Sequence, residues 1–483
     1  MNFDWLADLS LLAVQFYTLL SIVIRVASLL SIPLRHPPAV ATAWLLVILL
    51  WPWPGFLAYA LLGSRMLPAV RLQRHRRMAQ HLQDIRQQLS HGRRRAPQLP
   101  PTLQLTVRLA ESLGNMGITS GNLCRYLDTS ESFFSHLVSL IDGAKQEVNM
   151  IFYIFSDVGP GRAVVSALGR AAARGVTCRL IVDSVGSSEF IRSGGVSRLK
   201  ELGVQVREAL PVRLFRRKAE RYDLRNHRKL VIVDRRYAVT GSHNLCDPTF
   251  GRRGLVWQDL SVTVEGPVVH QLEYVFLEDW HVETGELLDV SHLLAAPETP
   301  GNWSLQTVPS GPSYDTENYL MLVLSAIMGA RRQVTITTPY LIPTVSLIQA
   351  MQTASRRGVR IRLLVPAKTD HFIVGNAAKA YYSDLLAAGV KIFLYHGGML
   401  HAKTITVDDD LAFVGSSNFD TRSFALNFEI SLVLYGTQEA HSLLHIQNRY
   451  LRSCVPLNPR RWSLRGRPAR AVQALTRLLS PLL

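Results

Sequence analysis

The sequence is poor in cysteine and poor in charge. Its four cysteines, which form no C-x-x-C pair, are Cys124, Cys178, Cys246 and Cys454. This pattern argues against a disulfide scaffold and against a cysteine zinc site. Only 18% of the residues are charged and 48% are hydrophobic, which excludes a chain disordered throughout. A length of 483 residues exceeds one small domain and predicts two or three folded units.

Acidic residues are scarce relative to basic ones. The chain has 36 aspartates and glutamates against 53 lysines and arginines, a formal net charge of +17. A surface this basic favours an anionic partner, and the two candidates are nucleic acid and an acidic membrane.

Two long stretches near the N-terminus contain almost no charge. The first begins with the uncharged segment Leu9–Ile24, and the second is Pro37–Ser64. A helix of about 20 apolar residues crosses the core of a bilayer. The sequence therefore predicts membrane helices near residues 5–31 and 39–62, which together form a membrane hairpin over residues 1–64.

Alternatives remain for the first stretch. A signal peptide would begin with basic residues, whereas this chain has Asp4 and Asp8, so a signal peptide is disfavoured. Arg25 interrupts the apolar run and leaves a re-entrant or interfacial segment open. Pro52 and Pro54 fall inside the second stretch, and membrane helices tolerate proline where neighbouring groups satisfy the released carbonyls.

A basic juxtamembrane segment and linker is predicted for residues 65–104. Nine arginines and one acidic residue lie between Arg65 and Arg95. By the positive-inside rule, this excess places everything after residue 64 in the cytoplasm. The arginines either serve only as this topology signal or also bind anionic lipid headgroups.

The remainder of the chain resembles two copies of one unit. Arg174-Gly-Val-Thr-Cys-Arg-Leu-Ile-Val-Asp183 corresponds to Arg357-Gly-Val-Arg-Ile-Arg-Leu-Leu-Val-Pro366, and each reads as a helix, a glycine cap and a buried strand. Alternation of helix and strand predicts an α/β fold with a covered sheet. We place the first half at 105–290, the second at 305–457 and a basic C-terminal tail at 458–483. The tail is either an interfacial helix or a helix packed on the body.

A motif with six fixed residue positions occurs once in each half. The pattern H-x-K-x4-D-x6-G-S-x-N places the asparagine 17 residues after the histidine both times. The chain contains only eight lysines against 45 arginines, yet two of the eight occupy this slot. The motif residues are His227, Lys229, Asp234 and Asn244 in the first half, and His401, Lys403, Asp408 and Asn418 in the second.

The spacing has a chemical meaning. Histidine and lysine at i and i+2 on a strand point to the same side, and the second strand returns the asparagine to the same rim. Two halves packed about a pseudo-twofold axis would surround one pocket with two imidazoles, two ammonium groups and two amides. Such a pocket suits a phosphodiester, since one histidine can attack phosphorus while the other protonates the leaving oxygen. No metal is expected, because the lysines would repel a cation.

The paired motif resembles that of the phospholipase D superfamily. Supporting segments such as Thr337-Thr-Pro-Tyr-Leu-Ile-Pro343 and Gly398-Met-Leu-His-Ala-Lys403 make the chain similar to the bacterial cardiolipin synthases with two N-terminal membrane helices. The resemblance implies two tandem phospholipase D-like α/β halves behind the membrane hairpin. It implies a phosphatidyltransferase that converts two phosphatidylglycerols into cardiolipin and glycerol through a covalent phosphohistidine, with no cofactor, at the bacterial inner membrane.

The resemblance also assigns roles to residues. His227 is expected to be the nucleophile and His401 the general acid and then base, with the reverse assignment still open. The two lysines and two asparagines of the motifs would bind phosphate. In relatives a carboxylate further along the chain orients each histidine, and the matching residues here are Asp259 for His227 and Glu429 for His401.

Two further expectations concern neighbouring residues. Asp234 and Asp408 complete the motif and are expected to have a structural or indirect role. His243, in the variable slot of the first G-S-x-N, is where relatives more often have a small or apolar residue. We expect an exposed side chain there, with contact to a lipid headgroup as the alternative.

Three functions remain in competition. A lipid transphosphatidylase acting on phosphatidylglycerol in an anionic membrane is favoured, with no nucleic acid partner expected. A membrane-bound phospholipase D hydrolase or a membrane-tethered nuclease would use the same chemistry. A non-enzymatic lipid- or nucleic-acid-binding protein is disfavoured, because both motifs are complete. Phosphatidylethanolamine as a co-substrate stays open, as does the oligomeric state.

Overall fold

The computed structural model describes residues 4–36, 38–63, 67–89, 99–212, 223–251, 254–294 and 296–480. The chain forms two compact units. The N-terminal unit comprises Met1–Met66 with Arg221–Asp223, and the body comprises Leu67–Glu220 with Leu224–Leu483.

Three helices form the N-terminal unit: α1 (Asp4–Ser31), α2 (Pro38–Leu50) and α3 (Pro52–Leu62). Within α1, Leu12–Ser31 is long and apolar enough to cross a membrane by length and composition. Helix α3 runs parallel to α1, because Trp53 donates to the Ser21 hydroxyl at 3.2 Å and the Tyr59 hydroxyl lies 3.2 Å from Nε2 of His36. Helix α2 runs antiparallel to both, because Trp44 packs on Tyr59 and Arg25 donates to the Leu49 carbonyl at 3.2 Å. The guanidinium of Arg25 thereby satisfies one of the carbonyls left unpaired at the end of α2.

The second predicted membrane helix is not continuous. The expected helix over residues 39–62 divides at Trp51, whose backbone dihedrals of −132° and 85° are not helical. Pro52 and Pro54 supply no N–H to the preceding turn, so α2 ends and α3 begins anew. The expectation of a single second helix is therefore wrong.

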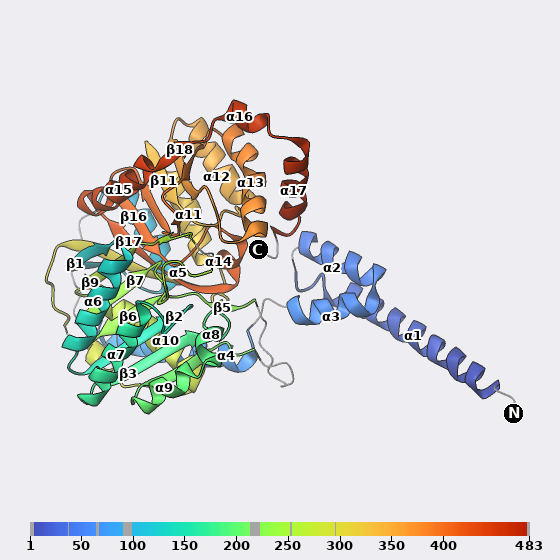
Figure 1. The fold of residues 1–483 in the computed structure, drawn as a ribbon, viewed down its shortest axis with the longest axis horizontal. Coiled ribbons are helices and arrows are strands. Elements are labelled where there is room, and N and C mark those ends of the chain that lie inside the picture. Colours follow the sequence, from blue (N-terminus) through green and yellow to red (C-terminus); the bar gives the residue numbers. More distant parts are fainter. Residues whose placement is uncertain are drawn as a thin grey trace. The chain divides into compact units, whose positions relative to one another are not determined.

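A 16-stranded sheet forms the centre of the body (Figure 1). Its middle is the antiparallel pair of β1 (Thr119–Leu127) and β10 (Trp303–Ser310). Outward from β1 the order is β9 (Ser261–Glu265), β7 (Tyr237–Gly241), β6 (Leu230–Val233), β2 (Glu147–Phe152), β3 (Thr177–Asp183) and β4 (Gln205–Ala209). Outward from β10 it is β17 (Asn427–Tyr435), β16 (Leu411–Gly415), β15 (Thr404–Val407), β11 (Gln333–Thr337), β12 (Arg360–Pro366), β13 (Lys391–Tyr395) and β18 (Cys454–Pro456).

The two sides of the sheet repeat the same succession of pairings. Strands β2, β3 and β4 are parallel to one another, as are β11, β12 and β13. Next to each parallel set lies an antiparallel set, which is β6, β7 and β9 on one side and β15, β16 and β17 on the other. The predicted α/β class is confirmed.

Helices cover both faces of the sheet. On one face, α6 (Ser130–Gly143) and α7 (Gly161–Ala173) pack on the first parallel set, and α11 (Asn318–Gly329), α12 (Val345–Arg356) and α13 (Phe372–Ala387) pack on the second. On the opposite face, α10 (Val268–Thr284) and α15 (Thr437–Arg452) share one apolar cluster with strands of both sides. Alternate residues of β6 enter different clusters, Leu230 with α10 and Val231 with α7, as the period of a strand requires. Short helices α8 (Ser188–Arg192), α9 (Gly195–Glu201), α14 (Thr421–Ala425) and η1 (Ser291–Leu294) lie in the connections.

The predicted juxtamembrane segment and linker contains two helices that belong to the body. Helix α4 (Ala69–Leu89) packs on α10. Arg71 forms a bidentate ion pair with Glu283 at 2.7 and 2.6 Å, and Arg74 donates to the Val282 carbonyl. Helix α5 (Pro101–Gly114) begins inside the same range, while residues 90–98 of the predicted linker lie outside the described residues. At least two of the basic residues thus stabilise the body itself.

The C-terminal tail contains α16 (Pro459–Ser463) and α17 (Arg467–Arg477). Helix α17 packs on α13 through an ion pair of Arg477 with Asp384 at 2.9 Å. Of the two arrangements expected for the tail, packing on the body is the one observed; residues 481–483 lie outside the described residues.

Candidate active site

Each motif histidine lies in an extended segment just before a central strand. The strand pair β5 (Arg225–Asn226) with β17 places His227, whose N–H donates to the Phe428 carbonyl at 2.9 Å. The pair β14 (Met399–Leu400) with β8 (Trp257–Gln258) places His401, whose N–H donates to the Gln258 carbonyl at 2.8 Å. The backbone of each sequence half therefore holds the histidine of the other.

Both histidines line one cavity of about 560 Å³. The predicted phosphate ligands Asn244 and Asn418 line the same cavity. The remaining lining residues include acidic, basic and aromatic side chains, among them Glu189, Arg192, Tyr340, Asp370 and Arg422. The structure thus brings together four of the predicted site residues that are separated by up to 191 positions in the sequence.

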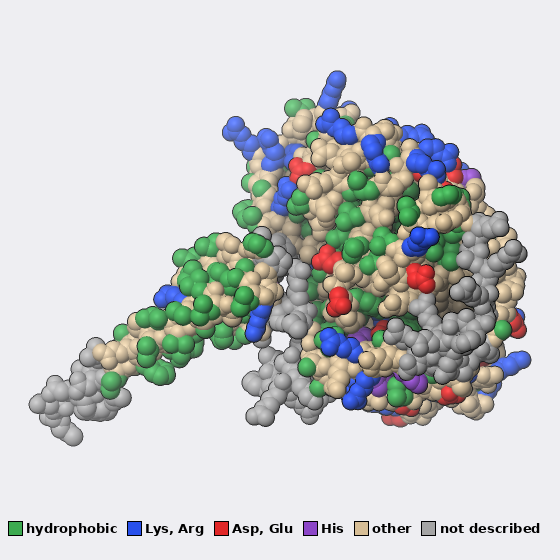
Figure 2. Space-filling view, turned by 180° about the vertical axis from the view of Figure 1, so that it is seen from behind, with side chains coloured by type: hydrophobic (Ala, Val, Ile, Leu, Met, Phe, Trp, Pro, Cys, Tyr) green, Lys and Arg blue, Asp and Glu red, His purple; other side chains and the backbone are tan. Residues whose placement is uncertain are grey.

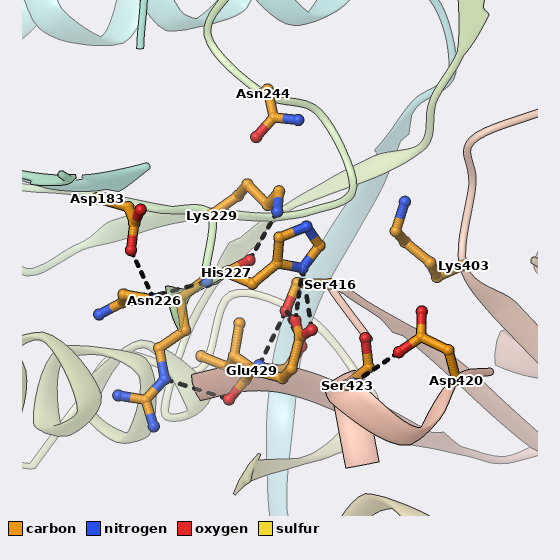
Figure 3. A network of polar contacts seen from close by, with 12 residues as sticks. Asp183, Asn226, His227, Lys229, Asn244, Lys403, Ser416, Asp420, Ser423 and Glu429 are labelled. Atoms are coloured by element: carbon orange, nitrogen blue, oxygen red, sulfur yellow. Dashed lines mark hydrogen bonds and ion pairs between the residues drawn. The ribbon is translucent and has the colours of Figure 1, made fainter. Parts of the chain in front are cut away.

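The two motif lysines are buried next to the histidines. Lys229 and Lys403 are each 2% exposed, and neither is among the lining residues of the cavity. Each ammonium donates to the carbonyl oxygen of the histidine two residues earlier, at 2.7 Å and 2.6 Å. Figure 3 shows the side chains of Lys229 and Lys403 on opposite sides of His227.

The orienting carboxylates are exchanged between the halves. Nδ1 of His227 lies 2.9 Å from a carboxylate oxygen of Glu429, and Nδ1 of His401 lies 2.6 Å from Asp259. The two expected carboxylates are correct, but the expected assignment of Asp259 to His227 and of Glu429 to His401 is wrong. The physical reason is that strands of the two halves pair beside the cavity. Asp259 follows β8, which pairs with β14 just before His401, and Glu429 lies in β17, which pairs with β5 just before His227.

Two functional residues were missed by the sequence reasoning: the serines of the G-S-x-N segments. The hydroxyl of Ser242 donates to Asp259 at 2.6 Å, and that of Ser416 donates to Glu429 at 2.5 Å. Each serine also accepts the N–H of the residue after that carboxylate, Leu260 or Ile430. The duplicated motif contained the signal, since the serine recurs at the same position in both copies.

The motif glycine permits this close approach. A Cβ on Gly241 would lie 2.5 Å from the Leu260 carbonyl oxygen, and one on Gly415 would lie 2.5 Å from the Ile430 carbonyl oxygen. These distances are far below van der Waals contact, so a larger residue would push the serine away from its carboxylate. Glycine in the motif thus follows from the packing of adjacent strands.

Aromatic rings enclose the histidines. Tyr153 lies edge-on to His227 with ring centroids 4.8 Å apart, and Trp257 lies 4.4 Å from His401. Tyr340 approaches His401 at 6.4 Å and donates its hydroxyl to Asp370 at 2.8 Å. No sequence pattern identified these residues, because their role depends on which loops meet at the cavity.

Burial shifts the acid–base behaviour of the site. Loss of solvent and the nearby lysines hold the pKa of His227 well below its usual value, and burial lowers the pKa of Lys229 to about 7 and that of Lys403 to about 8. Burial raises the pKa of Glu429 to about 8. In contrast, His401 holds the pKa of Asp259 well below its ordinary value despite burial. The two histidine–carboxylate pairs therefore differ electrostatically.

His243 differs from the expected exposed side chain. It is 2% exposed, stacks on Phe133 with ring centroids 4.3 Å apart and lies 2.9 Å from the Ser261 hydroxyl. Burial lowers its pKa to about 4, so it is a neutral core residue. The expectation of exposure is wrong because the turn after β7 directs this side chain toward α6.

The motif aspartates lie outside the cavity. Asp234 accepts the backbone N–H groups of Lys145, Gln146 and Glu147, and Asp408 accepts those of three matching residues before β11, Arg331, Arg332 and Gln333. Neither is among the cavity-lining residues. Their hydrogen bonds hold the turn in front of a parallel strand, β2 or β11.

Replacement of Asp408 by alanine is expected to reduce stability more than chemistry. Three backbone N–H groups in partly buried hydrogen bonds would lose their acceptor, at a cost of about 0.5–1.5 kcal/mol for each bond. Urea unfolding of the detergent-solubilised protein would measure the loss. Asp409→Ala is the matched control, since Asp409 forms ion pairs with the exposed side chains of Arg332 and His441 and its loss should change stability by about 0.2–1 kcal/mol. Lost activity with unchanged stability in Asp408→Ala would contradict the structural role.

Comparison with known proteins agrees with the geometry. The sequence matches the family described as cardiolipin synthase, PLD-like domain, over residues 137–280 and 323–450. Cardiolipin synthase A of Pectobacterium carotovorum is 36% identical over 92% of this chain and 93% of its own length. That of Edwardsiella ictaluri is 35% identical over 97% and 99%, respectively. The structure of phosphatidylserine synthase from Haemophilus influenzae shares the fold, with a TM-score of 0.58 and 15% identity over 78% of this chain and all of that one.

Proposed function

Because this chain belongs to the cardiolipin synthase family with phospholipase D-like domains, we propose that it transfers a phosphatidyl group from one phosphatidylglycerol to another. The products are cardiolipin and glycerol. The observation that carries this proposal is the single cavity lined by His227 and His401, each histidine paired with a buried carboxylate.

The first step forms a covalent intermediate. Nε2 of His227 attacks the phosphorus of phosphatidylglycerol, a P–N bond forms, and the bond from phosphorus to the terminal glycerol oxygen breaks. His401 gives its proton to that oxygen, and glycerol leaves. Burial lowers the pKa of both histidines, but further for His227, whose lone pair stays available, than for His401, where Asp259 opposes the shift. The anionic Asp259 stabilises a protonated His401.

The second step transfers the phosphatidyl group. A hydroxyl of the second phosphatidylglycerol gives its proton to His401 and attacks phosphorus, and the P–N bond breaks. The products are cardiolipin and a regenerated His227. One phosphodiester replaces another, so the exchange requires no nucleotide.

The lysines and asparagines would bind the phosphate. An ammonium has three donors, and each lysine uses one on a histidine carbonyl. Asn244 and Asn418 face the cavity and can donate to the non-bridging oxygens. Positive charge and hydrogen bonds directed at the phosphorus centre stabilise the charge that develops there.

The architecture fits a membrane-embedded substrate. We regard the matching strand orders on the two sides of the sheet as two tandem phospholipase D-like halves related by a pseudo-twofold axis. We propose that α1 crosses the bacterial inner membrane and that α2 and α3, which fold back on each other, enter the membrane beside it. The arginines after residue 64 would then place the body in the cytoplasm. The substrate and product would then remain in the same bilayer as the enzyme.

A reconstituted assay tests the function. Purified full-length protein in vesicles of phosphatidylglycerol should produce cardiolipin and release an equal amount of glycerol. Release of phosphatidic acid without cardiolipin would move the assignment to a phospholipase D hydrolase. Cleavage of nucleic acid that depends on His227 would support a nuclease instead.

Activity is expected to fall in alkaline solution. A lysine whose pKa is lowered carries its charge only below that pKa, so Lys229 and Lys403 lose their positive charge as the pH rises past about 7 and about 8. The kcat/KM for phosphatidylglycerol should therefore decrease above pH 8. A pH profile between 6 and 10 measures this, and a flat profile throughout that interval would contradict a phosphate-binding role for the lysines.

A further inference from the structure

Helix α17 buries polar side chains and exposes apolar ones, the reverse of an ordinary surface helix. The buried side of α17 and of the turn after it is polar: Gln473 accepts from Arg465, Arg477 pairs with Asp384 of α13, and Ser480 accepts from the Tyr381 hydroxyl at 2.9 Å. A surface helix of a soluble protein normally buries its apolar stripe and exposes its polar one. The opposite orientation means that the apolar stripe faces away from the body.

The outward face of α17 carries a continuous set of apolar side chains. At 100° per residue, Leu475 lies opposite Gln473 on α17 and Val472 lies beside Leu475. Leu478 and Leu479 follow in the turn directly after the helix. All four are exposed, Leu475 at 65% and Leu478 at 75%. The body offers no covering for them among its described residues, so they require an apolar partner outside it.

The charge around this face favours an anionic bilayer as that partner. Residues 458–483 contain six arginines and no aspartate or glutamate. Figure 2 shows arginine and lysine side chains projecting at the upper left of the body, where α16 and α17 lie, beside exposed apolar side chains. An apolar stripe flanked by arginines is the pattern of helices that lie in the membrane interface.

The face continues toward the mouth of the cavity. Contacts pass from Arg477–Asp384 to Ser480–Tyr381, so the end of α17 runs antiparallel to α13 toward the first turn of that helix. Phe372 in that turn is 72% exposed, and its neighbour Ile373 is also exposed. The residues on either side of this pair, His371 and Val374, line the active-site cavity.

We propose that the outer face of α17, together with Phe372 and Ile373, is a membrane-contact surface that enters an anionic bilayer and holds the cavity rim at the level of the lipid headgroups. The surface is distinct from the N-terminal helices and would deliver phosphatidylglycerol to the site without its leaving the membrane. Its purpose rests on the proposed function, but its contact with lipid can be measured separately from activity.

The direct test places a fluorophore on the face. Full-length protein carrying Leu475→Cys, with the partly exposed Cys124 and Cys454 replaced by serine, is labelled with an environment-sensitive dye in vesicles of phosphatidylglycerol and phosphatidylcholine. Brominated acyl chains should quench the dye, and aqueous iodide should not. Leu202→Cys is the control, since Leu202 is an exposed leucine that follows α9 near β4, at the opposite edge of the sheet. A dye at Leu202→Cys should be quenched by iodide and not by brominated acyl chains.

Each other result overturns the proposal. Quenching of the Leu475 position by iodide alone would mean that the face stays in water. Protection from both quenchers would mean that protein covers it, either the N-terminal unit or a second copy of the chain.

A functional comparison complements the probe. The double variant Leu475→Glu, Leu478→Glu should lose at least tenfold in cardiolipin formation from vesicle phosphatidylglycerol but retain its rate on a short-chain phosphatidylglycerol dissolved below its micelle concentration. Leu202→Glu should retain both rates. Equal loss on both substrates would indicate damage to the fold and contradict a membrane-contact role. Absence of turnover in the unaltered protein would instead reject the proposed function, while the quenching result still decides the surface.

Discussion

The variant His227→Ala is expected to lose cardiolipin formation by roughly 10⁴-fold or more, and to form no covalent phosphatidyl-enzyme. Removal of a nucleophile from a catalytic unit usually costs that much, because the remaining groups cannot replace the bond that it forms. Acid quenching would destroy a phosphohistidine, so the trap is alkaline denaturation after mixing with radiolabelled phosphatidylglycerol.

His401→Ala should have a different signature. Its turnover should also fall by orders of magnitude, yet the label should accumulate on the protein, because His227 can still attack while no base activates the second lipid. Label on His401 in the His227→Ala variant would reverse the two assignments. Label in neither the unaltered protein nor His401→Ala would contradict a covalent route.

The exchanged carboxylates lead to the second large effect. Asp259→Asn is expected to behave like a His401 variant and to accumulate phosphatidyl-enzyme, although Asp259 belongs to the sequence half of His227. Glu429→Gln is expected to behave like a His227 variant, with little label on the protein. Each should reduce turnover by about 10²–10⁴-fold, since a carboxylate opposite Nδ1 fixes the tautomer and stabilises the imidazolium.

Double variants separate the two pairs. Residues in contact show non-additive effects, whereas distant ones add. Asp259→Asn should therefore add little to His401→Ala, and Glu429→Gln should add little to His227→Ala. Full additivity of Asp259→Asn with His401→Ala, or of Glu429→Gln with His227→Ala, would contradict the contacts at 2.6 and 2.9 Å. Ser242→Ala offers a milder check, because it removes only the hydrogen bond at 2.6 Å to Asp259.

The asymmetry between the pairs gives a physical basis for two roles in one nearly symmetric site. Burial raises the pKa of Glu429 to about 8 against the opposing charge of Lys229, whereas Asp259 remains anionic beside His401. A histidine beside a fixed negative charge is suited to carry a proton. The pKa of His227 is lowered further than that of His401, which suits His227 to remain neutral and attack. Twin motifs thus acquire different chemistry from their surroundings.

Much of the site could be predicted from the sequence. The alternation of helix and strand identified the α/β class, and two copies of H-x-K-x4-D-x6-G-S-x-N identified the histidines, lysines and asparagines. The spacing sufficed because a strand period and a short turn place these side chains locally. The recurrence in both halves also pointed to a shared pocket, although neither copy alone could have done so.

Other features depended on long-range packing. The second apolar stretch has the length and composition of one membrane helix, but Pro52 interrupts the helix at Trp51. His243 follows a strand by only two residues and was expected in solvent, yet Phe133 of a distant helix covers it. Neither result is encoded in a local pattern, because each depends on which segment packs against the residue.

The amino-acid sequence by itself determined which residues are the candidate catalytic groups and that they occur in pairs, since these follow from residue type and local spacing. Only the tertiary structure decided which carboxylate serves which histidine. The partners are 202 and 142 residues apart, and their contact arises where strands of the two halves meet across the cavity. Spacing along one half cannot reveal a hydrogen bond that is completed by the other.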